Sequence, residues 1–152
     1  MRALLSAALA LLCGAAAAQA TPAGLWKTYS DRSGLADGLV RIVEVDGAFE
    51  GTVEKVFSPP AADPDPRCED CPGEFKDKPV IGLKILRGLR PNRAAPAREG
   101  GQRYSGGEIL DPDDGKVYRC SAKLLDGGRT LELRGYVGIE LFGRTQVWRR
   151  EE

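Results

Sequence analysis

Near its C-terminal end the chain reads GYVGIELFGRTQVWRR, residues Gly135 to Arg150. Gly138 and Gly143 flank a short connection, and β-branched and aromatic residues stand on both sides of it. The pattern predicts two antiparallel strands joined by a turn. It contains no arrangement of nucleophile, acid and base, so it indicates a fold and not a reaction.

Further strands are predicted upstream, because short apolar runs alternate with turn signals such as Asp46-Gly47 and no helical periodicity is sustained. Apolar and polar residues alternate in Tyr118–Leu124 and in Thr130–Leu133, which is typical of strands with one buried face. The predicted strands are 25–29, 39–45, 49–57, 80–86 (a strand or a short helical turn), 104–110, 116–125, 130–137 and 144–150. About eight such strands predict an all-β chain, a single antiparallel up-and-down β-barrel with one long proline-rich loop, 58–79.

Residues 1–20 have the features of a secretory signal peptide. Arg2 is followed by an apolar run over 3–18, and the run ends in small residues that place cleavage near Ala20. The apolar run has about 16 residues, fewer than the roughly 20 that span a bilayer. We therefore expect a mature chain of residues 21–152, a single β-barrel domain with no transmembrane segment.

The signal peptide predicts a periplasmic or secreted protein. A lipid anchor at Cys13 is the alternative, and it is disfavoured because Leu12 precedes this cysteine and Ala10 stands three residues before it. Bacterial lipidation signals carry a small residue and a leucine at these two places.

Composition excludes several classes of function. The chain has no histidine, which excludes Ser-His-Asp and Cys-His catalysis and the usual zinc and haem sites. Its 22 basic and 22 acidic residues give a balanced charge, so we expect no nucleic-acid partner. Neither an enzymatic activity nor a cofactor is predicted.

Cys68 and Cys71 lie in the 58–79 loop with two residues between them. Acidic neighbours, Glu69 and Asp70, disfavour the thiolate that redox chemistry needs, and only Cys120 remains as a further soft metal ligand. We therefore predict a loop-tying disulfide between Cys68 and Cys71, no metal, and a free, buried Cys120. A disulfide from Cys120 to either loop cysteine remains the alternative.

Two acidic segments are candidates for sites. Asp63 to Glu74 has the length of a calcium-binding loop, but Cys68 stands where such a loop requires glycine. Asp111-Pro112-Asp113-Asp114-Gly115 offers paired carboxylates and reads better as a hairpin turn.

Aromatic residues could line a ligand cavity or fill the core of the barrel. The candidates are Trp26, Tyr104, Tyr118, Tyr136, Phe142 and Trp148. Arg134 and Arg144 could hold an anionic head group at the mouth of a cavity, or they could face solvent or pair with Glu132 or Glu140. The sequence does not distinguish a hollow barrel from a packed one.

The order of motifs resembles one known family. The motifs are Gly24-x-Trp26, Pro79-Val80-Ile81-Gly82-Leu83, Gly106-Gly107-x-Ile109-x-Asp111-Pro112-x-x-Gly115-Lys116-x-Tyr118, Arg134-Gly135-Tyr136-x-Gly138 and Gly143-Arg144-Thr145-x-x-Trp148-x-Arg150. Together they resemble the exported bacterial family called domain of unknown function 2147. The resemblance implies a lipocalin-like barrel and no established activity.

The resemblance also implies how the barrel is closed. Gly24-x-Trp26 is similar to the Gly-x-Trp motif of lipocalin-like barrels, where an arginine from a late strand covers the tryptophan. Arg149 or Arg150 would play that part here, with Trp148 beside them. Any ligand would then lie at the other end of the barrel.

The leading interpretation is a non-enzymatic periplasmic binding protein for a small apolar ligand or lipid. One alternative is an envelope structural or interaction module that presents the loop 58–79 to a protein partner. Another is a thiol–disulfide redox protein that uses Cys68 and Cys71.

Overall fold

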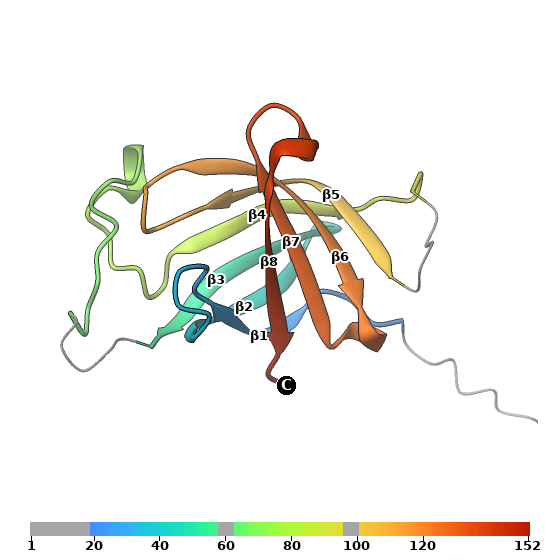
Figure 1. The fold of residues 1–152 in the computed structure, drawn as a ribbon, viewed down its shortest axis with the longest axis horizontal. Coiled ribbons are helices and arrows are strands. Elements are labelled where there is room, and N and C mark those ends of the chain that lie inside the picture. The colour runs from blue at the N-terminus through green and yellow to red at the C-terminus, as the bar shows by residue number, and fades with distance from the viewer. Residues whose placement is uncertain (1–18, 58–62, 96–100) are drawn as a thin grey trace, which may run out of the picture.

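The computed structural model describes residues 19–57, 63–95 and 101–152, so most of the predicted signal peptide lies outside it. In the described residues, eight antiparallel strands follow one another around a closed barrel, and β8 returns to pair with β1 (Figure 1). The strands are β1 (Gly24–Tyr29), β2 (Ala36–Val45), β3 (Ala48–Val56), β4 (Lys84–Pro91), β5 (Gln102–Leu110), β6 (Val117–Leu125), β7 (Thr130–Tyr136) and β8 (Arg144–Arg150). Short 3-10 turns are η1 (Gly73–Phe75), η3 (Asp126–Gly128) and η4 (Glu140–Phe142). The predicted up-and-down barrel is confirmed.

The β2–β3 hairpin shows how local sequence sets the register. Asp46 and Gly47 have φ of 51° and 73°, and a tight hairpin turn needs positive φ at both central residues. Val45 consequently pairs with Ala48, and the pairing continues along both strands. The predicted Asp-Gly turn is confirmed.

The predicted boundaries of the fourth strand are wrong. Residues 80–83 form a turn, in which the Leu83 N–H donates to the Val80 carbonyl over 3.1 Å, and β4 runs from Lys84 to Pro91. Val80 and Leu83 are apolar because they pack against the core from this turn. Pro91 is the last residue of β4 and pairs in register with Tyr104 of β5.

The core lies inside the barrel, and every strand contributes buried residues to it. Fully buried side chains include Trp26, Ile42, Leu86, Leu89, Cys120, Leu131 and Trp148. In β6, Cys120, Ala122 and Leu124 are buried while the residues between them are not, as the alternation predicted. No helix among the described residues is long and apolar enough to cross a membrane.

The two ends of the barrel differ. At one end, here called the closed end, Trp26 of β1 pairs with Arg150 of β8. The opposite end, here called the open end, carries the connections β1–β2, β3–β4, β5–β6 and β7–β8. The long β3–β4 connection and the β7–β8 loop both stand out from the strands (Figure 1).

Candidate functional site

A cavity of about 910 Å³ lies inside the barrel and opens at the open end. Its wall is largely apolar, and Leu133 and Trp148 extend it toward the middle of the barrel. Other apolar lining residues are Val40, Val53, Val56, Phe57, Val80, Ile85, Ile109 and Leu110. The volume lies within the range of about 300–1,000 Å³ that small-molecule sites occupy.

The β3–β4 connection forms one wall of this cavity. Asp63 and Pro66 line the cavity from this segment, and an isolated bridge between Arg67 and Pro79 closes the segment into a loop. The bridge is supported by the Cys68 N–H, which donates to the Lys78 carbonyl over 2.9 Å. The part of the loop over residues 58–62 lies outside the described residues.

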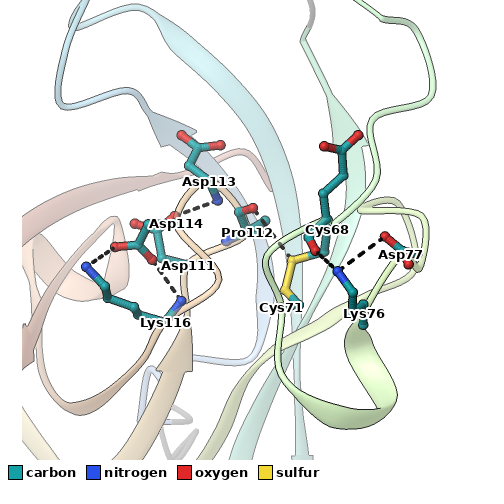
Figure 2. The surroundings of a disulfide bond; sticks show 10 residues. Cys68, Cys71, Lys76, Asp77, Asp111, Pro112, Asp113, Asp114 and Lys116 are labelled. Carbon is teal, nitrogen blue, oxygen red and sulfur yellow. Dashed lines mark hydrogen bonds and ion pairs between the residues drawn. A yellow bond between two sulfur atoms is a disulfide. The ribbon is translucent and has the colours of Figure 1, made fainter.

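The disulfide-bonded part of this loop packs against the β5–β6 turn. Cys68 and Cys71 are disulfide-bonded and buried, and the Cys68 sulfur lies 3.6 Å from the Pro112 carbonyl oxygen (Figure 2). Gly115 of the same turn approaches so closely that a Cβ on it would lie 1.9 Å from the Asp70 carbonyl oxygen. Burial of both sulfur atoms leaves little access for thiol–disulfide exchange.

Cys120 is a free thiol buried inside the barrel. Burial raises its pKa to about 12, because the thiolate would lose its hydration there. This placement agrees with the preferred pairing and leaves Cys120 unreactive at neutral pH.

The burial of Cys120 can be tested by thiol titration. We expect no reaction of Cys120 with a disulfide reagent in the folded protein and complete reaction after unfolding in guanidinium chloride. The N-terminus must be determined first, because Cys13 adds a thiol wherever it is retained. Peptide mapping that finds Cys120 in a disulfide would contradict this assignment.

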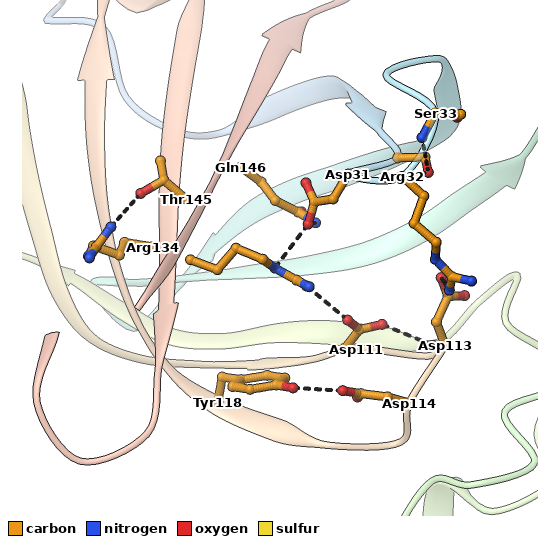
Figure 3. Close-up of polar contacts among 12 residues, drawn as sticks. Asp31, Arg32, Ser33, Asp111, Asp113, Asp114, Tyr118, Arg134, Thr145 and Gln146 are labelled. Atoms are coloured by element: carbon orange, nitrogen blue, oxygen red, sulfur yellow. Dashed lines mark hydrogen bonds and ion pairs between the residues drawn. The ribbon is translucent and has the colours of Figure 1, made fainter. Parts of the chain in front are cut away.

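Arg144 organises the rim of the cavity. Its guanidinium lies 2.9 Å from the Asp31 carboxylate and 3.1 Å from that of Asp111, so it links the β1–β2 loop to the β5–β6 turn. Gln146, next on the same face of β8, donates to Asp31 over 3.1 Å (Figure 3). These partners differ from the Glu132 and Glu140 considered above.

Asp114 and Tyr118 form a second polar pair at the rim. The Tyr118 hydroxyl donates to the Asp114 carboxylate over 2.6 Å (Figure 3). This bond raises the pKa of Tyr118. Burial raises the pKa of Asp114, but the hydrogen bonds from Tyr118 and Lys116 outweigh it, so the pKa of Asp114 lies below its usual value. Asp114 is therefore ionised at neutral pH.

Asp37 is a half-buried acid on the cavity wall that the sequence did not single out. Burial raises its pKa, and the charges of Asp31 and Asp113 add to this, while a hydrogen bond from the Thr28 hydroxyl opposes it. Asp37 stands at the start of β2, and nothing in the local sequence distinguishes it from a turn residue.

The rim contains carboxylates but no metal centre. Within the described part of the chain, no group of three or more histidine, cysteine, aspartate or glutamate side chains could hold a metal ion. Asp111 to Gly115 forms a turn, with the Gly115 N–H donating to the Asp111 carbonyl over 2.9 Å. The carboxylates of Asp111 and Asp114 accept hydrogen bonds from backbone N–H groups within the turn, and Asp111 also pairs with Arg144 at the rim.

Five of the eight candidates named from the sequence line the cavity: Tyr118, Tyr136, Phe142, Trp148 and Arg144. Tyr104 does not, because its register with Pro91 places it at the closed end, where its ring packs edge-on against Phe49 at 5.5 Å. Arg134 does not either, because it lies between Leu133 and Gly135, which face inward. Both assignments to the cavity are corrected.

The closed end is built around Trp26 and Arg150. The Trp26 indole donates to the Pro22 carbonyl over 2.8 Å, and the Arg150 guanidinium lies 4.4 Å from the centre of the Trp26 ring. Arg149 faces the other way and donates to Thr130 over 2.6 Å. Of the two arginines considered for this contact, Arg150 makes it.

Comparisons with known proteins agree with this architecture. A solved structure, "Protein HP1028 from the human pathogen Helicobacter pylori belongs to the lipocalin family", superposes with a TM-score of 0.68 at 18% identity, covering 88% of this chain and 84% of that chain. At this identity the likeness shows the fold alone. A search of curated proteins found no match. The family model described as "Uncharacterized protein conserved in bacteria (DUF2147)" matches residues 24–150. Since this match runs from the first strand of the barrel to the last, the chain belongs to the DUF2147 family of bacterial proteins.

Proposed function

We propose that the protein is a non-enzymatic binding protein that holds a small, mainly apolar molecule or a lipid inside its barrel. The observation that carries this proposal is the cavity of about 910 Å³ with its apolar wall and polar rim. An apolar ligand there would exchange contact with water for contact with residues such as Val53, Ile109 and Trp148.

The arrangement of polar groups gives the ligand an orientation. Charged side chains gather at the mouth, where Arg144, Asp31 and Asp111 are already paired. The apolar part of a ligand would lie toward Leu133 and Trp148, and its polar end would face the rim.

The proposed location is the periplasm or the medium outside the cell, after removal of residues 1–20. A disulfide at Cys68–Cys71 suits an oxidising compartment of this kind. Two other functions have less support. A redox role requires accessible sulfur atoms, yet Cys68 and Cys71 are buried. A docking role for the 58–79 loop is less supported because Glu74 and Phe75 already contact the barrel: both lie against Arg87 of β4, at 3.9 Å and 4.4 Å.

A neutral fluorescent probe, N-phenyl-1-naphthylamine, tests the cavity. We expect saturable fluorescence enhancement with the native protein and at least tenfold weaker binding by the Val56→Trp/Ile109→Trp variant, because both side chains line the cavity. The matched control is Val43→Trp/Val147→Trp, which places the same bulk at two exposed positions.

Thermal unfolding must show that the filled variant is folded, and Ile109→Trp alone serves if it is not. Native mass spectrometry and lipid extraction of the protein from its own source identify the bound molecule. Absence of saturable binding by the native protein, or equal binding by the filled and control variants, would contradict the proposal.

A further inference from the structure

The β7–β8 loop presents four large apolar side chains to solvent. Val137, Ile139, Leu141 and Phe142, here called the apolar tip, are 75%, 58%, 76% and 79% exposed. Single exposed apolar residues are common on protein surfaces, but four within six residues of one loop form a concentrated patch. The loop stands out from the end of the barrel (Figure 1).

The tip is held in this conformation by Arg134. The Arg134 guanidinium donates to the Glu140 carbonyl over 2.7 Å and to the Leu141 carbonyl over 2.9 Å. A third bond reaches the Thr145 hydroxyl over 2.8 Å. Arg134, a candidate for holding a ligand, therefore fixes the loop from its barrel side and leaves Leu141 and Phe142 facing outward.

Several polar groups of the loop have partners within the protein. The Phe142 N–H donates to the Ile139 carbonyl and the Gly143 N–H to the Glu140 carbonyl, over 3.3 and 3.1 Å. The Glu140 carboxylate accepts a hydrogen bond from Ser121 on β6. Because these groups and the carbonyls bound by Arg134 already have partners, they would keep them if the tip moved out of water.

The tip is continuous with the mouth of the cavity. Val137 and Phe142 are exposed on the outside, and both also line the cavity. Whatever covers the tip therefore lies at the entrance of the barrel. An apolar molecule could pass between such a surface and the cavity without crossing bulk water.

We propose that the apolar tip docks the barrel on a lipid bilayer by inserting into its interfacial region. A stable protein interface involves roughly 20–30 residues on each side, whereas the tip is a single convex loop of residues 137–143. A bilayer requires no matching groove and accepts a protruding apolar loop. Two basic side chains lie at the base of the loop, because the Arg119 guanidinium lies 5.8 Å from the Tyr136 ring and Arg134 donates to the Glu140 carbonyl.

Vesicles of phosphatidylcholine test the docking surface. Leu141→Trp places a fluorophore in the tip, and the native Trp26 and Trp148 are buried and contribute a constant background. We expect the emission of Trp at position 141 to shift to shorter wavelength when vesicles are added. Val43→Trp, at an exposed position on β2, is the matched control and should show no shift.

Removing apolar side chains from the tip gives a second test, in which co-sedimentation with vesicles is measured. Ile139→Ser/Leu141→Ser should lower the fraction that co-sediments with vesicles at least tenfold, whereas Val43→Ser/Val45→Ser should not. Binding should persist at high salt, because apolar insertion carries it. All variants are compared as chains shown to lack residues 1–20, because the apolar run over residues 3–18 would itself bind vesicles and hide the effect of the tip.

Two outcomes would overturn the inference: no emission shift at position 141, or equal sedimentation of the tip and control variants. Crosslinking that captures a protein through the tip, without vesicle binding, would also overturn it. Docking does not require an occupied cavity. Ile139 and Leu141 lie outside the cavity lining, so binding of N-phenyl-1-naphthylamine without vesicles tests the proposed function separately.

Discussion

Replacing Arg150 with alanine should lower the free energy of unfolding by about 3–4 kcal/mol. The guanidinium donates to the carbonyls of Gly128, Ala23 and Thr21 over 2.5, 2.7 and 2.7 Å. Hydrogen bonds to charged groups contribute about 1.5–3 kcal/mol each, and partial exposure of this side chain reduces their sum. The contact with the Trp26 ring adds about 0.5–2 kcal/mol.

The neighbouring arginine provides the control. Arg149 makes an ion pair with Asp126 at 3.7 Å and a hydrogen bond to Thr130, but its side chain is 56% exposed and Thr130 keeps its bond to Asp126, so Arg149→Ala should cost only about 1 kcal/mol. The loss of unfolding free energy for Arg150→Lys should lie between those for Arg150→Ala and Arg149→Ala, because an ammonium cannot reproduce the planar fork of donors of a guanidinium. Urea unfolding at pH 7 measures all three. Equal losses for Arg150→Ala and Arg149→Ala would refute the central role of Arg150.

Gly115→Ala should destabilise the protein by about 3 kcal/mol and release the disulfide loop. Gly115 has φ of +69°, which costs an alanine roughly 1 kcal/mol. Its Cβ would also lie 1.9 Å from the Asp70 carbonyl oxygen and 2.8 Å from the Cys71 nitrogen. Overpacking of this kind costs about 1–3 kcal/mol, since the loop must move away from the turn.

Gly34→Ala separates backbone strain from steric overlap. Gly34 has φ of +70°, nearly the same as Gly115, but no atom lies within 4 Å of the place that a Cβ would occupy. This variant should therefore lose only the roughly 1 kcal/mol that the backbone conformation costs. Urea unfolding measures the difference, and trypsin should cut the Gly115→Ala protein faster at Arg67 and Lys76. Indistinguishable behaviour of the two variants would show that the loop does not depend on this contact.

The barrel was predictable because its signals are local. Asp46-Gly47 specifies a hairpin by its backbone conformation alone, and the alternation around Cys120 and Leu133 specifies which face is buried. The β4 boundaries were missed because Val80 and Leu83 are apolar for a tertiary reason. They pack on the core from a turn, and an apolar run by itself does not distinguish this from a strand.

The candidate site was less predictable because two things decide whether a residue lines the cavity. One is the side of the strand on which it lies, and the other is its position along the barrel axis. For Arg134, the side of the strand alone shows that it does not line the cavity. Leu131 and Leu133 face inward, so the alternation places this arginine outside the barrel. Tyr104 faces inward, and only the pairing of β5 with β4 shows that it lies at the closed end. Whether the barrel is hollow depends on how all the inward side chains fill it, which no single segment determines.

The pairing of Trp26 with Arg150 also bears on how the barrel forms. The hairpins from β5 to β8 join neighbouring segments, whereas β1 meets β8 across almost the whole length of the barrel. Closing so long a loop has a high entropic cost, so this seam should form after the local hairpins. Contacts that form after the rate-limiting step affect mainly the unfolding rate. The Arg150 cluster would then determine how long a closed barrel persists, and have little influence on how quickly it assembles.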